Sequence, residues 1–263
     1  MSIRLDEALT GALRELARVP TLLVALDFDG TVAPEVDSPE KARALPEARD
    51  AVLRLAALPA TRVALVSGRA IASLEQVSGF GDDVLLVGSN GIELRLDSPD
   101  DVLALDAAEQ EQLEVLQEVL GEVADAIADV WLEQKPAGFA LHTRLASERG
   151  ARVAHLVALG EASAEVEGLT VREGKNVLEF SVRSTTKGEA IEHLRRYTHA
   201  DAVFYSGDDV TDEDAFDALR NDDLGLKSGP GRTAAPYRVE GPAEVAAVLA
   251  ALATFREGDV HEQ

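Results

Sequence analysis

The sequence predicts an α/β fold: a mostly parallel sheet with helices on its faces, interrupted by an inserted α+β domain. Short apolar runs alternate with helical patterns at both ends of the 263-residue chain, which is the order of elements in βαβ units. Between residues 105 and 183 the order changes to two successive helix–strand–strand units. We therefore expect a core domain formed by residues 1–104 and 184–263, with residues 105–183 as a separate domain within it.

The first part of the core alternates helices and strands. Leu5, Leu9, Leu13 and Leu16 recur at helical spacing and predict an amphipathic helix. The continuous apolar run that follows is typical of a strand buried on both faces, and Pro46 opens a second helix. The expected elements are a helix at 4–18, a strand at 22–27, a helix at 46–58, a strand at 62–66, a helix ending near Val77 and a strand at 84–87.

The inserted domain and the rest of the core follow. Short turns at residues 136–138 and 173–174 suit antiparallel hairpins, which differ from the parallel strands of the core. In the inserted domain we expect helices at 105–129 and 147–162 and strands at 130–135, 139–145, 169–174 and 176–183. In the rest of the core we expect helices at 186–198, from 211 and at 242–253, and strands at 202–205 and 223–226.

Composition narrows the class of protein. The formal net charge of −23 makes nucleic acid and anionic membrane surfaces unsuitable partners, and an anionic substrate would need cations placed at its own site. The chain has no Cys, so it has neither disulfides nor thiolate chemistry. Its first residues are too charged for a signal peptide, and no apolar stretch is long enough to span a membrane. We expect a cytoplasmic monomer.

Two aspartates and a glycine end the first predicted strand. The apolar run at 22–26 is followed by Asp27, Asp29 and Gly30. Carboxylates at the end of a buried strand need positive charge nearby, and the ligands of open α/β sheets bind at this strand edge. The pattern predicts a metal and an anionic substrate. A plain turn is an alternative, whereas a calcium-binding EF-hand loop has its glycine and glutamate at other positions.

Other predicted strand and helix ends carry groups of related chemistry: Ser67, Lys187, Asp208, Asp209 and Asp212. Each alone could be a helix cap, a surface lysine or an acidic first helical turn. Together with the two earlier aspartates they make a complete phosphoryl-transfer site.

In such a site Asp27 would attack phosphorus, and Asp29 would protonate the leaving oxygen and then take a proton from water. The carboxylates of Asp27 and Asp208, with the backbone carbonyl of Asp29, would hold Mg²⁺ through hard oxygen ligands. The groups expected to neutralise the phosphoryl oxygens are Ser67, Lys187 and the backbone amides at Asp29 and Gly30.

The motifs at residues 27–31, 66–68, 187–188 and 207–213 resemble, in order and spacing, the four motifs of haloacid dehalogenase superfamily phosphatases. The resemblance spans nearly the whole chain. It implies a Rossmann-like core, an aspartyl-phosphate formed on Asp27, and Mg²⁺ at Asp27, Asp29 and Asp208. It places Gly30, Ser67, Gly68 and Lys187 on the phosphate. Asp209 and Asp212 would bind the metal or support its ligands, and we expect Asp212 to lie behind the ligands.

The inserted domain resembles the cap of the subgroup that includes trehalose-6-phosphate phosphatases. The resemblance rests on charged residues along its predicted strands: Glu133, Lys135, His142, Arg144, Lys175 and Glu179. Residues two apart on a strand share a face, so any pair of them is also compatible with a solvated charged face. The full set predicts a sugar-binding face, and closure of such a cap would exclude water.

The resemblance implies Mg²⁺-dependent hydrolysis of the sugar phosphate trehalose 6-phosphate. Alternatives are other capped sugar phosphatases, acting on sucrose phosphate, glucosylglycerol phosphate or a mannosyl phosphoester, and a non-catalytic regulatory domain. The intact carboxylates and Lys187 disfavour the regulatory domain. Asn90 stands where many relatives have a histidine. Because Asn forms hydrogen bonds but does not titrate near neutrality, this change bears on substrate identity and leaves the core chemistry unaffected.

Overall fold

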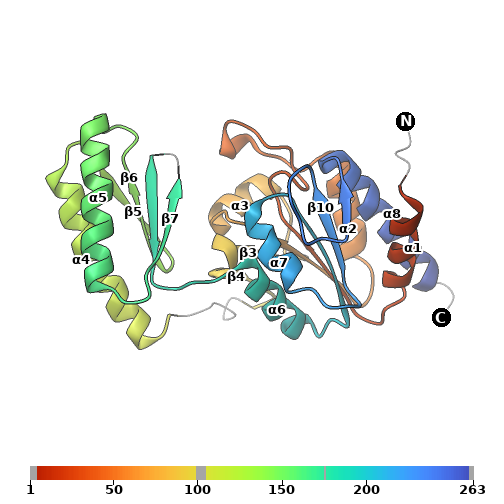
Figure 1. The fold of residues 1–263 in the computed structure, drawn as a ribbon. Coiled ribbons are helices and arrows are strands. Elements are labelled where there is room, and N and C mark those ends of the chain that lie inside the picture. Colours follow the sequence, from red (N-terminus) through yellow and green to blue (C-terminus); the bar gives the residue numbers. More distant parts are fainter. Residues whose placement is uncertain (1–4, 99–104, 175, 261–263) are drawn as a thin grey trace. The chain divides into compact units, whose positions relative to one another are not determined.

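A computed structural model describes residues 5–98, 105–174 and 176–260 (Figure 1). The chain divides into two compact units. The core unit comprises Met1–Val102 and Thr185–Gln263, and the inserted unit comprises Leu103–Ser184. The domain boundary that the sequence predicts at residue 104 lies outside the described residues.

A twisted sheet forms the centre of the core unit. Its strands, in spatial order, are β11 (Tyr237–Val239), β10 (Leu224–Ser228), β9 (Ala202–Gly207), β1 (Leu22–Leu26), β2 (Thr61–Val66), β3 (Val84–Gly88) and β4 (Glu93–Arg95). Neighbouring strands run parallel, except that β4 runs antiparallel to β3. The predicted α/β class with a mostly parallel sheet is confirmed.

The order of the strands creates a switch point beside β1. The chain proceeds from β1 to β2, β3 and β4 on one side, and later returns to place β9 on the other side. The register pairs Leu26 with both Leu65 and Ser206. The residues that follow β1, β2 and β9 therefore meet at one edge, where ligands of open α/β sheets bind.

Helices cover both faces of this sheet (Figure 1). Leu22, Val24 and Leu26 pack in one cluster with apolar residues of α1, α2 and α8. Leu23 and Ala25 point to the opposite face, where α6 packs on β1, and both are fully buried. Burial on two faces explains why β1 is a continuous apolar run. The helices of the core unit are α1 (Glu7–Leu16), α2 (Pro46–Ala56), α3 (Ile71–Ser78), α6 (Lys187–Thr198), α7 (Glu213–Asp217) and α8 (Pro242–Val260).

The inserted unit has a four-stranded antiparallel sheet and two long helices, α4 (Ala107–Ala126) and α5 (Glu148–Glu165). The strands, in spatial order, are β5 (Trp131–Lys135), β6 (Gly138–His142), β8 (Val177–Ser181) and β7 (Thr170–Gly174). The register pairs Leu141 with both Leu132 and Leu178; this apolar face packs against α4. The opposite face carries the charged residues.

Several elements differ from the prediction. The helix expected at 242–253 runs on to Val260 as α8, and 3₁₀ turns at Pro39–Lys41 and Ser89–Gly91 were not predicted. The helix expected from residue 211 is a 3₁₀ turn at Val210–Asp212 followed by the five-residue α7. The strands β4 and β11 were not predicted, because each has three residues and gives no periodic pattern.

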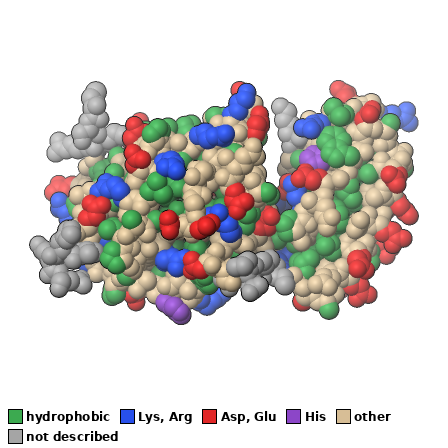
Figure 2. Space-filling model, turned by 180° about the vertical axis from the view of Figure 1, so that it is seen from behind, with side chains coloured by type: hydrophobic (Ala, Val, Ile, Leu, Met, Phe, Trp, Pro, Cys, Tyr) green, Lys and Arg blue, Asp and Glu red, His purple; other side chains and the backbone are tan. Residues whose placement is uncertain are grey.

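The surface carries both signs of charge. On the face that Figure 2 shows, acidic and basic side chains are interspersed. Among the helices of the described segments, none combines the length and the apolar character that crossing a membrane requires.

Candidate active site

Asp27 is held at the carboxyl end of β1 by the sheet itself. Its N–H donates to the carbonyl of Ser206 at 2.9 Å, which continues the pairing with β9. Only 5% of Asp27 is exposed, because the strand that precedes it is buried on both faces. The carboxylate is thus fixed where β1 and β9 diverge, with one oxygen 2.7 Å from the Lys187 ammonium.

Lys187 is the first residue of α6. The helix begins there because Thr186 and Glu189 form a capping box. The Lys187 Nζ donates to Asp27 Oδ1 and to Asp212 Oδ1, each at 2.7 Å, and the residue is 2% exposed. Burial alone would lower the pKa of Lys187, but the two carboxylates raise it above its ordinary value. The ammonium is therefore charged.

Asp212 shapes the loop that follows β9. Its Oδ2 accepts the N–H groups of Asp208 and Asp209, both at 2.9 Å. Its Oδ1 accepts the hydroxyl of Tyr205 at 2.5 Å as well as the Lys187 ammonium. These bonds occupy both oxygens, so Asp212 orients the loop that presents Asp208. Asp209 lies on the same loop with an exposed side chain.

Gly30 lets Asp208 approach β1. Its φ of +73° lies in the left-handed region, and a Cβ at this position would be 2.0 Å from Asp208 Oδ2. Its N–H donates to the carbonyl of Ala33 at 2.8 Å. The sequence predicted Gly30 as a phosphate ligand through this amide. In the structure the amide closes a turn, and the missing side chain leaves room for Asp208.

Three carboxylates lie close together, and the nearby positive charge does not balance their negative charge. Oxygens of Asp27, Asp208 and Asp212 lie within 4.8 Å of one another. Desolvation raises the pKa of Asp27 well above its usual range, against the attraction of Lys187. Desolvation, followed by the charge of Asp212, raises the pKa of Asp208 to about 6. A divalent cation would relieve this repulsion, and carboxylate oxygens are the ligands that Mg²⁺ prefers, so the donor set fits such an ion.

Asp29 is bound to a residue that was not predicted to belong to the site. Arg69 Nε donates to Asp29 Oδ2 at 2.5 Å, and Arg69 NH2 donates to Asp29 Oδ1 at 2.7 Å. The sequence signal was available, since Arg69 directly follows Ser67 and Gly68.

Ser67 and Gly68 form the turn after β2. Ser67 is 2% exposed, its N–H donates to the Val87 carbonyl, and its Oγ accepts the Arg69 N–H at 3.2 Å. Asn90 N–H donates to the Ser67 carbonyl at 2.9 Å, and a Cβ on Gly68 would be 3.5 Å from Asn90 Oδ1. Asn90 therefore packs directly against this turn, with a positive φ of 56° that Asn tolerates.

Lys227 is a second buried cation and lies beside the loop that carries Asp208 and Asp209. It was not predicted from the sequence. It lies near the end of β10, and its Nζ donates to the Asp208 carbonyl at 2.6 Å and to a Glu213 carboxylate oxygen at 3.3 Å. A lysine within the otherwise apolar run of β10 was the available signal.

The charged face of the inserted unit brings most of its predicted residues together. Glu133 accepts the Lys135 ammonium at 2.6 Å and contacts His142 Nε2 at 2.8 Å. Glu179 pairs with Ala140 in the register, so it lies on the same face. Lys175 lies outside the described residues.

Trp131 connects His142 with Arg144, the last predicted residue of this face, and was itself not predicted. Its ring stacks on His142, with centroids 4.9 Å apart and an interplanar angle of 9°. The Arg144 guanidinium carbon lies 5.1 Å from the Trp131 ring centroid, a cation–π distance. Trp131 is two residues before Glu133, so strand alternation could have revealed it.

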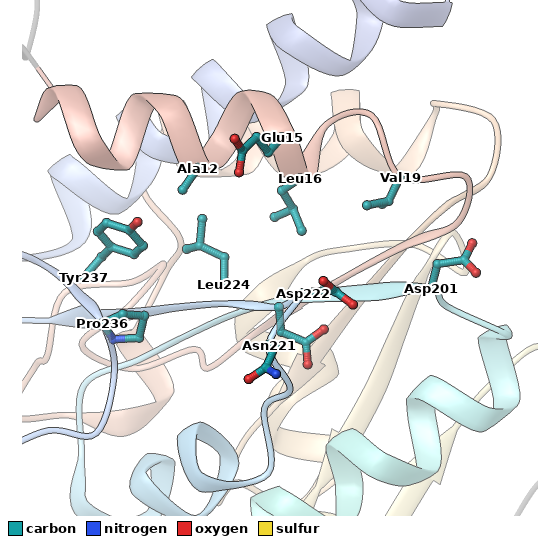
Figure 3. A pocket seen from close by; sticks show the side chains of 11 residues that line it. Ala12, Glu15, Leu16, Val19, Asp201, Asn221, Asp222, Leu224, Pro236 and Tyr237 are labelled. Carbon is teal, nitrogen blue, oxygen red and sulfur yellow. The ribbon is translucent and has the colours of Figure 1, made fainter.

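A cavity of about 510 Å³ lies elsewhere in the core unit (Figure 3). Asp201 and Leu224, which line it, stand at the amino ends of β9 and β10. The predicted site residues follow the carboxyl ends of the strands, so this cavity is separate from the carboxylate cluster.

A family model described as trehalose-phosphatase matches residues 25–245. The chain belongs to the trehalose-phosphatase family. The match includes the carboxylates, Lys187 and the whole inserted unit, and it confirms the predicted membership of the haloacid dehalogenase superfamily.

A relative within this family is a trehalose-phosphate phosphatase of Mycobacterium ulcerans, 34% identical over 265 residues. The alignment covers 94% of this chain and 66% of that protein, so the chain spans just under two thirds of the relative's length.

Solved structures share the fold. A trehalose-6-phosphate phosphatase of Aspergillus fumigatus is 25% identical with a TM-score of 0.66, covering 97% of this chain and 99% of that one. The C-terminal domain of a Candida albicans trehalose synthase regulatory protein is 17% identical with a TM-score of 0.64, covering 92% and 97%. The likeness to the second of these structures concerns the fold alone.

The burial of Asp27 predicts a stability effect. Because its folded pKa is raised, the charged form costs stability as pH rises through that pKa. Without divalent cations, Asp27→Asn should raise the free energy of unfolding by roughly 1 kcal/mol at about pH 7, and by less at about pH 3, where the unfolded carboxyl is also largely protonated. Urea unfolding in EDTA measures both values. A less stable variant at neutral pH would contradict the account of the cluster.

Proposed function

We propose that this chain is a phosphatase that hydrolyses trehalose 6-phosphate to trehalose and inorganic phosphate. The observation that supports this function most strongly is the buried contact of Asp27 with Lys187, beside Asp208. The family match over residues 25–245 supports it as well. A nucleophile, a fixed cation and a metal-type donor set at one sheet edge support phosphoryl transfer.

In the first step, a carboxylate oxygen of Asp27 forms a bond to phosphorus, and the bond from phosphorus to the sugar oxygen breaks. Asp29 gives its proton to that oxygen, so that the sugar leaves as a neutral alcohol. The product is an aspartyl-phosphate on Asp27. The Lys187 ammonium, which contacts Asp27 Oδ1, neutralises charge on the phosphoryl oxygens, and the Ser67 hydroxyl donates to one of them.

In the second step, Asp29 accepts a proton from a water molecule, whose oxygen forms a bond to phosphorus. The bond between phosphorus and Asp27 breaks, which restores the Asp27 carboxylate and releases inorganic phosphate. Asp29 thus ends the cycle with the proton that it gave away, and no further reactant is needed.

Mg²⁺ would be held by the carboxylates of Asp27 and Asp208 and by the backbone carbonyl of Asp29. When bound, it supplies positive charge that offsets the carboxylates and the phosphoryl oxygens. Asp212 would act behind these ligands, because its oxygens already accept the bonds that orient the loop. Asp209 has an exposed side chain, and we assign it a role in supporting the metal ligands rather than as a ligand itself.

The charged face of the inserted unit would bind the sugar hydroxyls. Glu133, Lys135 and His142 form one hydrogen-bonded set, and Trp131 holds His142 and Arg144 beside it. Charged groups that share a face and support one another are suited to fixing several hydroxyl groups at once. The polar and aromatic side chains of this face favour a sugar substrate over a small phosphate ester.

Substitution of the nucleophile tests the reaction. Asp27→Asn should lower phosphate release from trehalose 6-phosphate at least about 1,000-fold while the chain stays folded. A phosphate assay with Mg²⁺ measures this loss, and circular dichroism checks the fold. Asp217→Asn, which changes an exposed carboxylate on α7, is the matched control and should keep full activity. Retained turnover in Asp27→Asn would exclude Asp27 as the nucleophile.

Substitutions on the charged face test sugar recognition. Arg144→Ala and Trp131→Ala should each raise KM for trehalose 6-phosphate about tenfold, and leave kcat/KM for p-nitrophenyl phosphate within about twofold, because that ester has no sugar. Trp131→Phe should keep most of the stack. Arg152→Ala, at an exposed position on α5, is the control. Trp131 is the chain's one tryptophan, so its fluorescence also reports trehalose binding. Equal losses on both substrates would contradict a sugar-binding face.

A further inference from the structure

Arg69 and Asp29 form a two-pronged contact. Two nitrogens of the guanidinium each donate to a different oxygen of the Asp29 carboxylate, at 2.5 and 2.7 Å. The Arg69 side chain is 13% exposed and that of Asp29 is 34% exposed. This geometry fixes the plane of the carboxylate as well as its distance.

The remaining contacts of the guanidinium also hold it in place. Arg69 NH1 donates to Ser73 Oγ at 3.3 Å, and the guanidinium carbon lies 5.8 Å from the Phe28 ring centroid. All three nitrogens are therefore directed to Asp29 and Ser73. These contacts use three of the five N–H donors of the guanidinium and join it to Asp29, so they support an action on the reaction through Asp29, whereas a phosphate ligand would direct its donors mainly to the substrate.

The backbone of Arg69 is fixed by the segment that follows β3. The Ser89 N–H donates to the Arg69 carbonyl at 2.7 Å. One oxygen of Glu93 accepts both the Ile71 N–H at 3.0 Å and the Ser89 hydroxyl at 2.7 Å. A Cβ on Gly88 would be 2.8 Å from the Arg69 carbonyl oxygen, so the two segments pack closely. The fold thus orients Arg69 from a rigid base.

We propose that Arg69 is a positioning residue that holds the Asp29 carboxylate in the orientation from which it exchanges a proton with the leaving sugar oxygen and with water. The inference rests on the proposed role of Asp29. Proton transfer needs donor and acceptor within hydrogen-bond reach, and a carboxylate free to rotate spends less time in that arrangement. Misplacement of a catalytic group by about 1 Å costs on the order of 100-fold in rate.

A double-mutant cycle tests this role. Arg69→Ala should lower kcat for trehalose 6-phosphate about 100-fold with KM within about threefold. In an Asp29→Asn background the same substitution should change kcat by less than about twofold, because Arg69 then has no proton-transferring carboxylate to orient. Additive losses, or a raised KM with unchanged kcat, would overturn the proposal in favour of direct phosphate binding.

Two further variants serve as controls for the role of Arg69. Arg69→Lys keeps the charge but cannot form two parallel hydrogen bonds to Asp29. Its kcat should therefore fall about tenfold. If Arg69→Ala does not fold, Arg69→Lys replaces it in the double-mutant cycle. Arg62→Ala removes an arginine of β2 that pairs with Asp97 and should leave kcat unchanged. If the wild type hydrolyses p-nitrophenyl phosphate but not trehalose 6-phosphate, the substrate assignment fails. Because p-nitrophenolate leaves without a proton, the same cycle on that ester, measured under conditions where breakdown of the aspartyl-phosphate limits the rate, then tests whether Arg69 orients Asp29 toward water.

Discussion

The Lys187 ammonium lies 2.7 Å from carboxylate oxygens of both Asp27 and Asp212, and the arrangement of the site depends on this buried contact. It joins the end of β1, the start of α6 and the loop after β9. Removing the ammonium would leave two buried carboxylates facing each other, and breaking such a contact typically costs about 3–5 kcal/mol. The capping box at Thr186 and the Tyr205 bond to Asp212 keep both partners in place.

The cluster also explains how a strongly acidic chain could bind the proposed anionic substrate. The net charge of −23 repels phosphate at long range, but Lys187, Arg69 and Lys227 place buried or half-buried cations at the same sheet edge. Each of them pairs with groups that shape the site. Desolvation, together with the neighbouring carboxylates, raises the pKa of Asp27 and Asp208. The carboxylates still exceed the cations there, which makes the cluster suited to a divalent cation.

Patterns local in the sequence predicted most of this arrangement. Continuous apolar runs and the polar turns after them indicated the parallel sheet and the edge where Asp27 and Asp208 meet. What the sequence left open depends on contacts between distant segments. Examples are the hydrogen bonds that Asp212 forms with its own loop and with the Tyr205 hydroxyl, and the two-pronged contact of Arg69 with Asp29. These contacts form only when β1, β2 and β9 lie side by side. The Gly30 amide was expected on the phosphate, but a turn to Ala33 engages it, which no residue pattern reveals.

The most direct test of the central claim is phosphate release by the purified chain from a panel of sugar phosphates, with Mg²⁺ and with EDTA. The panel holds trehalose 6-phosphate, sucrose phosphate, glucosylglycerol phosphate and a mannosyl phosphoester. We expect a kcat/KM for trehalose 6-phosphate at least about 100-fold above the others, because polar groups of a sugar site that are left unpaired reject poorly matched sugars. We also expect phosphate release to be lost in EDTA. Equal rates across the panel, or full activity in EDTA, would contradict it.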